Sequence, residues 1–179
     1  ALIGTELDHV REAIESRRLA GNGRHTHACA ELLEKRIGSE RVILTPSCTA
    51  ALEMCALLAD IGPGDEVIMP SYTFVSTANA FALRGAEIRW CDIRRDTKNI
   101  DERLLEPLVT DRTKAIVVVH YGGVSCEMGP IGELCRERGI LLVEDAAQGL
   151  DCTHHGKPLG SFGDLATLSF HETKNIHCG

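Results

Sequence analysis

A lysine and a carboxylate stand in settings that suit covalent cofactor chemistry. Lys174 follows a short apolar run in Ser169-Phe170-His171-Glu172-Thr173-Lys174-Asn175, and Asp145 directly follows an expected strand in Glu144-Asp145-Ala146-Ala147-Gln148. A carbonyl cofactor such as pyridoxal phosphate needs a lysine amine to form a Schiff base, and a carboxylate to keep its pyridine nitrogen protonated. Among the lysines only Lys174 has such a setting, although a solvated surface lysine is the alternative.

A phosphate site is the second chemical feature. Pro46-Ser47-Cys48-Thr49-Ala50 lies between an expected strand and an expected helix. Backbone N–H groups at a helix N-terminus, together with the hydroxyls of Ser47 and Thr49, can bind a phosphate. An ordinary N-cap is the alternative, because Ser and Thr are favoured there without any ligand.

Three further side chains are expected at strand ends, where ligands of open α/β sheets collect. Gln148, three residues after Asp145, can bond a ring hydroxyl, and Ser169 can reach the same phosphate as Thr49. Phe74 can stack on a flat cofactor ring. The alternatives are a surface acid that begins a loop for Asp145 and core packing for Phe74.

Alternating helix and strand patterns must position these residues. The expected helices are Glu6–Arg18, His27–Ile37, Ser47–Asp60, Phe74–Leu83, Asp101–Leu108 and Ile131–Arg138. The expected strands are Arg41–Thr45, Glu66–Met69, Ile88–Asp92, Lys114–His120, Ile140–Glu144 and Leu165–Phe170. This order predicts an α/β fold, a three-layer sandwich with a mostly parallel sheet, in one domain or a piece of one.

Composition narrows the class further. A chain of 179 residues can bury one core of ordinary domain size, and its net charge of −7 argues against nucleic acid or an anionic membrane as the main partner. No apolar run approaches the ~18 residues of a membrane span. No signal peptide pattern opens the chain, so we expect a cytoplasmic location.

Cysteine and histidine are frequent, but their spacing is unsuited to metal or redox chemistry. The cysteines are residues 29, 48, 55, 91, 126, 135, 152 and 178, and none forms a Cys-x-x-Cys pair. We interpret most of them as buried, reduced thiols. His25-Thr26-His27-Ala28-Cys29 could bind a metal only if extended, whereas the segment has a helical pattern. We therefore expect no metal site.

The longest motifs resemble a known family. They are Gly62–Pro70, Ser71–Ala80, Glu144–Gln148 and Ser169–Asn175. These motifs resemble the DegT/DnrJ/EryC1/StrS-type sugar aminotransferases, which are fold-type I pyridoxal-phosphate enzymes, and the resemblance runs from Gly4-Thr5-Glu6-Leu7 to the end of the chain. The resemblance implies the large domain of an aspartate aminotransferase-like fold.

The resemblance also implies a role for each matching residue. Lys174 would bond covalently to the cofactor and later move the proton, and Asp145 would keep the pyridine nitrogen protonated. The remaining cofactor contacts would be Gln148 on the ring hydroxyl, Phe74 against the ring, and the Cys48 backbone, Thr49 and Ser169 on the phosphate.

The implied reaction transfers the amine of glutamate to a nucleotide-linked 4-keto-6-deoxy sugar. Leu44–Ala50 and His171–Asn175 are most similar to the subfamily that converts dTDP-4-keto-6-deoxyglucose to dTDP-4-amino-4,6-dideoxygalactose for the enterobacterial common antigen, a cell-surface polysaccharide related to lipopolysaccharide biosynthesis. Family members act as homodimers.

The chain departs from the family in length. Family members are about twice as long and continue after the lysine with Gly-Glu-Gly-Gly, of which only Gly179 is present. We expect residues 1–179 to be the N-terminal part of the cofactor-binding large domain, with the rest of that domain and the C-terminal small domain absent. Such a fragment alone would be poorly active or inactive.

Two other functions stay open at this stage. A pyridoxal-phosphate sugar dehydratase has the same fold, but such relatives have histidine where this chain has Lys174. An inactive truncated fragment is the second alternative. Intact Asp145, Gln148, Ser169 and Lys174 argue against loss of activity by point mutation.

Overall fold

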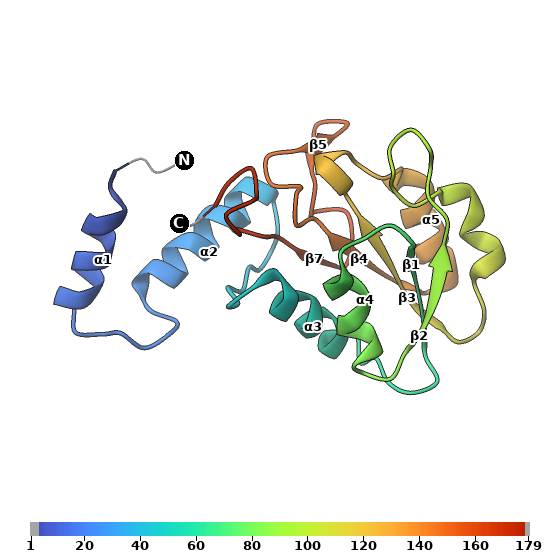
Figure 1. Ribbon diagram of the computed structural model, residues 1–179, viewed down its shortest axis with the longest axis horizontal. Coiled ribbons are helices and arrows are strands. Elements are labelled where there is room, and N and C mark those ends of the chain that lie inside the picture. The colour runs from blue at the N-terminus through green and yellow to red at the C-terminus, as the bar shows by residue number, and fades with distance from the viewer. Residues whose placement is uncertain (1–3, 178–179) are drawn as a thin grey trace.

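A five-stranded parallel sheet forms the centre of the protein (Figure 1). The computed structural model describes residues 4–177. The strands are β1 (Glu66–Pro70), β2 (Glu87–Cys91), β3 (Thr113–Val119), β4 (Leu141–Asp145) and β7 (Leu165–Thr167), in the order β2-β1-β3-β4-β7. All neighbours in this sheet are parallel. The chain places β2 on one side of β1 and β3 on the other, so the order of the strands reverses at the boundary between β1 and β3.

Helices cover both faces of this sheet. Helices α3 (Cys48–Leu58) and α4 (Val75–Ala82) lie on one face, and α5 (Met128–Arg138) lies on the other (Figure 1). The side chains of successive strand residues point to opposite faces of the sheet, so a strand can contribute side chains to the hydrophobic core on each face. Val117 packs in the core with α3 and α4, whereas Ile116 and Val118 pack in the core with α5. The predicted three-layer α/β sandwich is confirmed.

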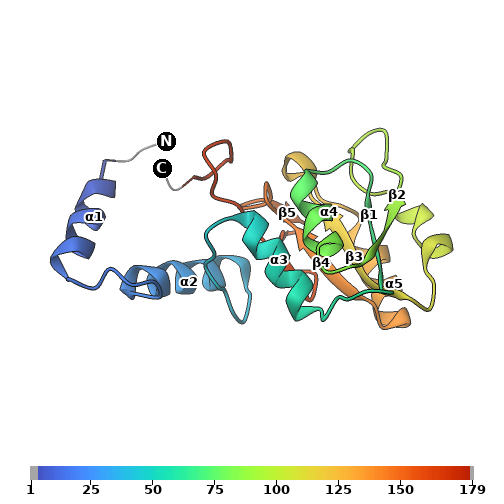
Figure 2. The same ribbon diagram turned by 60° about the horizontal axis from the view of Figure 1, so that its bottom comes forward.

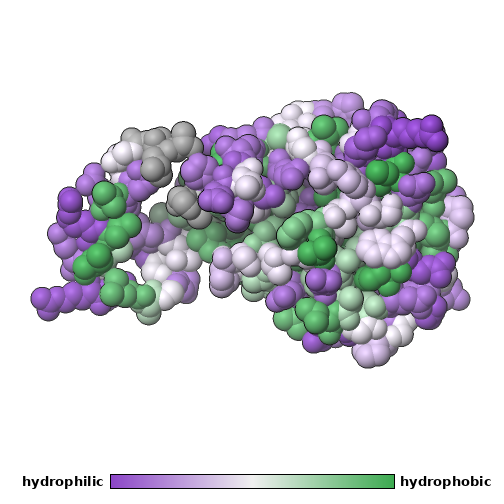
Figure 3. All heavy atoms as spheres, viewed as in Figure 1, coloured by the Kyte–Doolittle hydropathy of each residue, from purple (hydrophilic) through white to green (hydrophobic). Residues whose placement is uncertain are grey.

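Two helices extend beyond the sandwich. Figures 1 and 2 show α1 (Glu6–Glu15) and α2 (Arg24–Ile37) projecting away from the sheet. Leu33 and Ile37 of α2 are buried in a small cluster with Leu150. Helix α1 buries no residue, and Figure 3 shows hydrophobic side chains on its surface.

The predicted strand Arg41–Thr45 is wrong. This segment has no strand structure, and no strand of residues 4–177 pairs with it. Its apolar side chains are not sheet core: Ile43 is 60% exposed and Leu44 is 38% exposed. A short apolar run is strand-like only where a neighbouring strand accepts its backbone hydrogen bonds, and here none does.

The predicted helix Asp101–Leu108 is also wrong in type. Two 3-10 helices, η1 (Glu102–Leu104) and η2 (Glu106–Leu108), replace it. Pro107 has no N–H to donate and its ring crowds the preceding turn, so an α-helix cannot continue through it.

Other differences concern the ends of elements. The last strand, expected at Leu165–Phe170, stops at Thr167, and α5 begins at Met128 rather than Ile131. Pro130 is tolerated there because the first turn of a helix needs no N–H donor.

Three short elements were not expected from the sequence. They are η3 (Tyr121–Gly123) and the antiparallel hairpin of β5 (Thr153–His154) and β6 (Lys157–Pro158). Between β5 and β6, His155 and Gly156 have φ of 50° and 80°, as a tight hairpin turn requires. Among residues 4–177, no helix has both the length and the apolar character that crossing a membrane requires.

Candidate active site

Asp145 is the last residue of β4 and is almost completely buried, with 5% of its surface exposed. Both carboxylate oxygens accept hydrogen bonds. Thr77 Oγ1 donates to Oδ2 at 2.7 Å, and the Ala147 N–H donates to Oδ1 at 3.1 Å. A buried carboxylate held at both oxygens has a fixed direction, so Asp145 can present its charge to one point in space.

Thr77 connects Asp145 to a chain of hydroxyl groups. Thr77 is fully buried in α4, and Thr73 Oγ1 lies 2.8 Å from Thr77 Oγ1. Because Thr77 donates to Asp145, its oxygen is left to accept the proton of Thr73. Thr77 was not among the predicted site residues, and the only signal in the sequence was a second threonine four residues earlier, which lies just before α4.

The N-terminus of α3 lies next to this group. Ser47 caps the helix, since its Oγ accepts the Ala50 N–H at 3.1 Å. The ordinary cap and the phosphate site are therefore compatible. Thr49 Oγ1 lies 2.8 Å from Ser76 Oγ, and Ser76 directly precedes Thr77. The first N–H groups of a helix have no intrahelical acceptor, so this end of α3 can bind an anion.

Cys48 links the α3 terminus to both predicted catalytic residues. The pKa of its thiol is raised, first by burial and then by the negative charge of Asp145, while the nearby Thr167 hydroxyl and the positive charge of Lys174 act in the opposite direction. Thr167 is the register partner of Asp145 on β7. One thiol thus lies within electrostatic reach of both the carboxylate and the amine.

The other predicted residues lie around this centre. Ser169 is buried just after β7, and Lys174 is half-buried. Gln148 Oε1 accepts the Gly122 N–H at 2.5 Å, which ties it to the segment after β3. Phe74 directly precedes α4 and is 70% exposed, so the alternative of core packing is excluded. Asp145 and Lys174 thus both lie within electrostatic reach of Cys48, and the Phe74 ring is open to solvent.

A buried hydrogen-bond network around one carboxylate stands directly behind Asp145. Glu144 and His120 are fully buried, and Glu144 Oε2 lies 2.9 Å from His120 Nε2. The Cys126 N–H donates to His120 Nδ1, so Nε2 carries the imidazole proton and donates it to Glu144. Burial of Glu144 opposes its ionisation, but the hydrogen bonds from His120, Gly163 and Gly160 outweigh it and hold its pKa below the ordinary value.

Four thiols outside this site are buried and hard to ionise. Burial raises the pKa of Cys55, Cys126 and Cys135 to about 12 and that of Cys91 to about 11. The interpretation of these four as buried, reduced thiols is confirmed. Cys29 is exposed, against that interpretation, and Cys178 lies outside the described residues.

Two cavities lie elsewhere. One of about 730 Å³ runs between α2 and the segment 41–44, and one of about 130 Å³ lies between Arg36, Ile37 and the β5–β6 region. Neither is lined by Asp145, Cys48 or Lys174. These two cavities are therefore separate from the predicted cofactor residues.

A parallel α/β sandwich with a carboxylate, a lysine and an anion-binding helix terminus at its strand ends defines the class of pyridoxal-phosphate aminotransferases. The chain belongs to the DegT/DnrJ/EryC1/StrS aminotransferase family, which it matches over residues 2–179. The resemblance found in the sequence is confirmed.

Several curated relatives are similar over nearly the whole chain. The chain is 40% identical to the spore coat polysaccharide biosynthesis protein SpsC of Bacillus subtilis, over 99% of this chain and 46% of the relative. It is 39% identical to a GDP-perosamine synthase of Caulobacter vibrioides, over 99% and 48%. It is 38% identical to a dTDP-4-dehydro-2,3,6-trideoxy-D-glucose 4-aminotransferase of Saccharopolyspora spinosa, over 99% and 47%. The chain thus spans about half the length of these relatives.

Solved structures agree with this assignment. The aminotransferase from Psychrobacter cryohalolentis superposes with a TM-score of 0.94 at 29% identity, over 99% of this chain and 45% of that chain. NtdA from Bacillus subtilis, solved with bound cofactor PMP, has a TM-score of 0.89 at 31% identity, over 96% and 38%. The expectation of pyridoxal 5′-phosphate as the cofactor is confirmed at the level of the family.

The side chains of this structure fit that cofactor. Each oxygen of the Asp145 carboxylate accepts one protein hydrogen bond and keeps a further acceptor position, as a protonated ring nitrogen requires. The N-terminus of α3 supplies backbone donors for the phosphate, and Lys174 supplies an amine within electrostatic reach of Cys48. The donor set therefore has one suitable group for each polar part of pyridoxal phosphate.

Proposed function

We propose that the protein carrying this chain is a pyridoxal-phosphate-dependent sugar aminotransferase, and that this chain supplies the cofactor half of its site. The observation that carries the proposal is the arrangement of Asp145: buried at the end of β4, oriented by Thr77, and sharing the neighbour Cys48 with Lys174. A structural carboxylate would need neither the lysine nor the adjacent helix terminus.

Each residue has a defined task in this proposal. When bound, pyridoxal phosphate supplies a ring that accepts the electron pair left on carbon when a proton departs. Asp145 holds the proton on the ring nitrogen, and Lys174 Nζ holds the cofactor and carries the proton to and from the substrate carbon. The phosphate is bound by the Cys48 backbone, Thr49 and Ser169.

The remaining contacts orient the ring. Gln148 bonds the ring hydroxyl, for which its side-chain N–H₂ is free to serve because Oε1 already accepts the Gly122 N–H. Phe74 stacks on the ring with the face that is now exposed to solvent.

The proposed substrates are glutamate and a nucleotide-linked 4-keto-6-deoxy sugar. Two relatives support a sugar-nucleotide substrate, since their names specify GDP-perosamine and a dTDP-4-dehydro sugar. Within this class we propose dTDP-4-keto-6-deoxyglucose as the acceptor and dTDP-4-amino-4,6-dideoxygalactose as the product. The relatives differ in nucleotide and sugar, so this choice rests on the motif resemblance.

The organisation of the whole protein is proposed on the same basis. Residues 1–179 correspond to the N-terminal part of the cofactor-binding large domain, because the chain spans about half of its relatives. A homodimer and a cytoplasmic location stay predictions.

The direct test is transfer of labelled nitrogen. The chain, and a longer polypeptide that carries it, would be incubated with pyridoxal phosphate, ¹⁵N-glutamate and dTDP-4-keto-6-deoxyglucose. We expect ¹⁵N at C4 of the sugar with the longer polypeptide, and none after Lys174→Ala. Little or none is expected with the chain alone.

The same assay separates the alternatives. A sugar dehydratase would remove a hydroxyl group and leave no ¹⁵N in the sugar. An enzyme acting on another keto sugar would fail on this acceptor but still convert glutamate to 2-oxoglutarate on the bound cofactor. Absence of both nitrogen transfer and 2-oxoglutarate from a cofactor-loaded longer polypeptide would contradict the proposal.

A further inference from the structure

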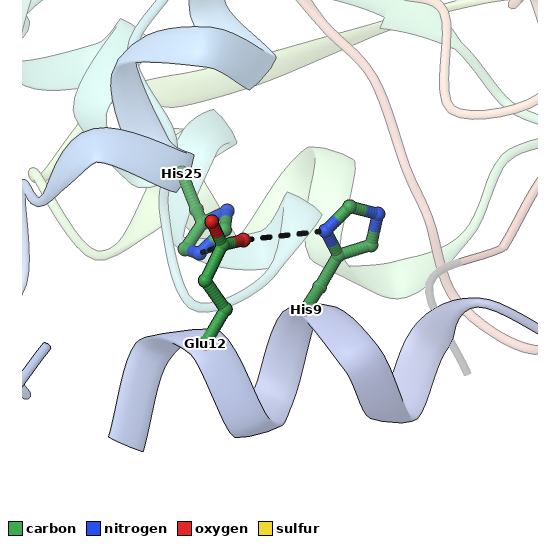
Figure 4. Close-up of side chains that lie close together, drawn as sticks. All are labelled: His9, Glu12 and His25. Carbon is green, nitrogen blue, oxygen red and sulfur yellow. Dashed lines mark ion pairs between the residues drawn. The ribbon is translucent and has the colours of Figure 1, made fainter. Parts of the chain in front are cut away.

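A cluster of two histidines and a glutamate joins α1 to α2, away from the active site. His9 and Glu12 lie one turn apart on α1, and His25 lies in the first turn of α2 (Figure 4). Glu12 Oε2 lies 3.9 Å from His9 Nδ1 and 3.8 Å from His25 Nε2. Within this cluster, one ligand atom from each residue lies within 4.8 Å of the others.

These separations are too long for hydrogen bonds and close to those around a metal ion. A tetrahedral ion with ligand bonds of about 2.0–2.1 Å places its ligand atoms about 3.4 Å apart. The His9, Glu12 and His25 side chains are 66%, 51% and 41% exposed. Because these side chains are exposed, they can turn enough to shorten the two distances from Glu12 Oε2 by a few tenths of an ångström. The two imidazole rings can turn further to bring their own nitrogens closer together.

His25 provides a second, independent observation. Its Nε2 atom is buried and has no hydrogen-bond partner in the part of the chain that the structure describes. Buried polar atoms of proteins are rarely left without a partner, and an exception calls for a missing ligand or ion. This atom faces Glu12 Oε2, the oxygen that also faces His9 (Figure 4).

A neighbouring arginine leaves that oxygen available. Arg24 pairs with the other oxygen of the same carboxylate, Glu12 Oε1. Glu12 is thereby held with Oε2 directed at the two imidazoles. The positive charge of Arg24 opposes a cation nearby, so the site must bind through coordination bonds and not through net charge.

We propose that His9 Nδ1, Glu12 Oε2 and His25 Nε2 bind a divalent transition-metal ion of the zinc class, with water in the remaining position. Two imidazole nitrogens and one carboxylate oxygen suit zinc, cobalt or nickel, whereas magnesium and calcium require oxygen ligands. This proposal replaces the expectation of no metal site. In it, His25 binds the ion together with residues of α1, and not together with His27 or Cys29.

The consequence is a metal-mediated link between α1 and α2. Helix α1 buries no residue, and its described ion pairs to α2 all use Glu12. An ion bound by ligands from both helices would fix α1 against α2, because it binds the folded arrangement and not the separated helices.

The experiment is equilibrium dialysis of the 179-residue chain against zinc chloride, in a Cys29→Ser background that removes the exposed thiol. We expect a site that His9→Ala and His25→Ala each weaken by at least about tenfold. His27→Ala is the matched control, since His27 is an exposed histidine on the same helix outside the cluster. The amount of zinc bound by the remaining cysteines would be the same in all these variants. Differences in zinc binding between the variants therefore measure binding at the cluster.

A second readout reports the link itself. Zinc should slow amide hydrogen exchange in α1 of the Cys29→Ser chain and of His27→Ala, but not of His9→Ala, and magnesium should have no effect. Equal zinc affinity in all variants, equal loss in His27→Ala, or equal binding of magnesium would each overturn the proposal.

Discussion

At the residue scale, the site depends on how one buried carboxylate is held. Asp145 accepts hydrogen bonds from Thr77, 68 residues away in the chain, and from the nearby Ala147 N–H. The first of these bonds connects β4 to α4, so the direction of the carboxylate depends on packing between two layers of the sandwich.

Replacing Thr77 tests this dependence. Thr77→Val keeps the shape of the side chain but removes the donor to Asp145, and a hydrogen bond to a charged group contributes about 1.5–3 kcal/mol. We expect pyridoxal phosphate to bind roughly tenfold or more weakly, measured by titration of its absorbance. Thr73→Val is the matched control, because Thr73 touches Thr77 and not Asp145, and it should have a smaller effect. Equal losses in both variants would show that Thr77 does not act through Asp145.

Residue types and local position predict part of this site. Lys174 and Asp145 could be found because a lysine after an apolar run and an acid at the end of a strand are visible in the sequence. Thr77 and Thr167 could not, because their significance comes from contacts across the sheet and not from neighbouring residues.

At the element scale, Glu144 organises the segment that leads into β7. Its oxygens accept N–H groups from Gly160 at 2.8 Å and from Phe162 and Gly163 at 2.6 Å each, in addition to its contact with His120. One side chain therefore fixes β3, β4 and the turn before β7 together.

Glu144→Gln should be strongly destabilising. The NH₂ end of the amide cannot accept a hydrogen bond, so two of the four buried donors lose their acceptor, at a cost of about 2–6 kcal/mol in total. We expect the free energy of unfolding in urea to fall by about that amount, while Glu53→Gln on the exposed side of α3 should change little. A Glu144→Gln protein as stable as the Glu53→Gln protein would refute this role.

The same carboxylate predicts an acid dependence. The pKa of Glu144 is lower in the folded protein than its ordinary value of 4.5, so its stabilising contribution is complete well above pH 4.5. That contribution is lost as pH falls below 4.5 through the folded-state pKa. The stability difference between the wild type and Glu144→Gln should therefore shrink in acid, and a difference that stays constant would contradict the assignment.

The cap of α3 gives a smaller effect. Ser47→Ala removes the acceptor of the Ala50 N–H and should lower the free energy of unfolding by about 1 kcal/mol. Ser39→Ala is the control, since Ser39 is not a helix cap and donates only to the Arg41 carbonyl. Both can be measured by urea denaturation, and equal effects would argue against the cap.

Elements with strong hydrophobic patterns were predictable, and those that depend on neighbours were not. The buried strands β3 and β4 were expected within one residue of their observed bounds, because continuous apolar runs are characteristic of parallel sheets. Arg41–Thr45 has a similar composition but no partner strand. The sequence shows whether a segment is apolar. Whether that segment pairs with another strand depends on the rest of the fold.

At the scale of the whole molecule, stability is concentrated in the sandwich. The five strands of the central sheet and helices α3, α4 and α5 share the two large cores, while α1 buries no residue. The chain therefore consists of a cooperative centre and a peripheral helix.

Shortening the chain tests this division. In the presence of a metal chelator, a variant that begins at Gly23 should keep the free energy of unfolding within about 0.5 kcal/mol, as surface changes do. A variant that begins at Ser39 also loses Leu33 and Ile37, and should be clearly destabilised. Trp90 on β2 allows fluorescence to follow both transitions. Destabilisation by the first deletion would contradict the division.

The central claim is that this chain builds the cofactor half of an aminotransferase site, and selective labelling of Lys174 tests it most directly. The chain and its Lys174→Ala variant would be mixed with stoichiometric pyridoxal phosphate, reduced with borohydride and mapped by mass spectrometry. We predict label at Lys174 in the wild type and its loss in the variant. Labelling scattered over the lysines, and unchanged in the variant, would contradict the claim.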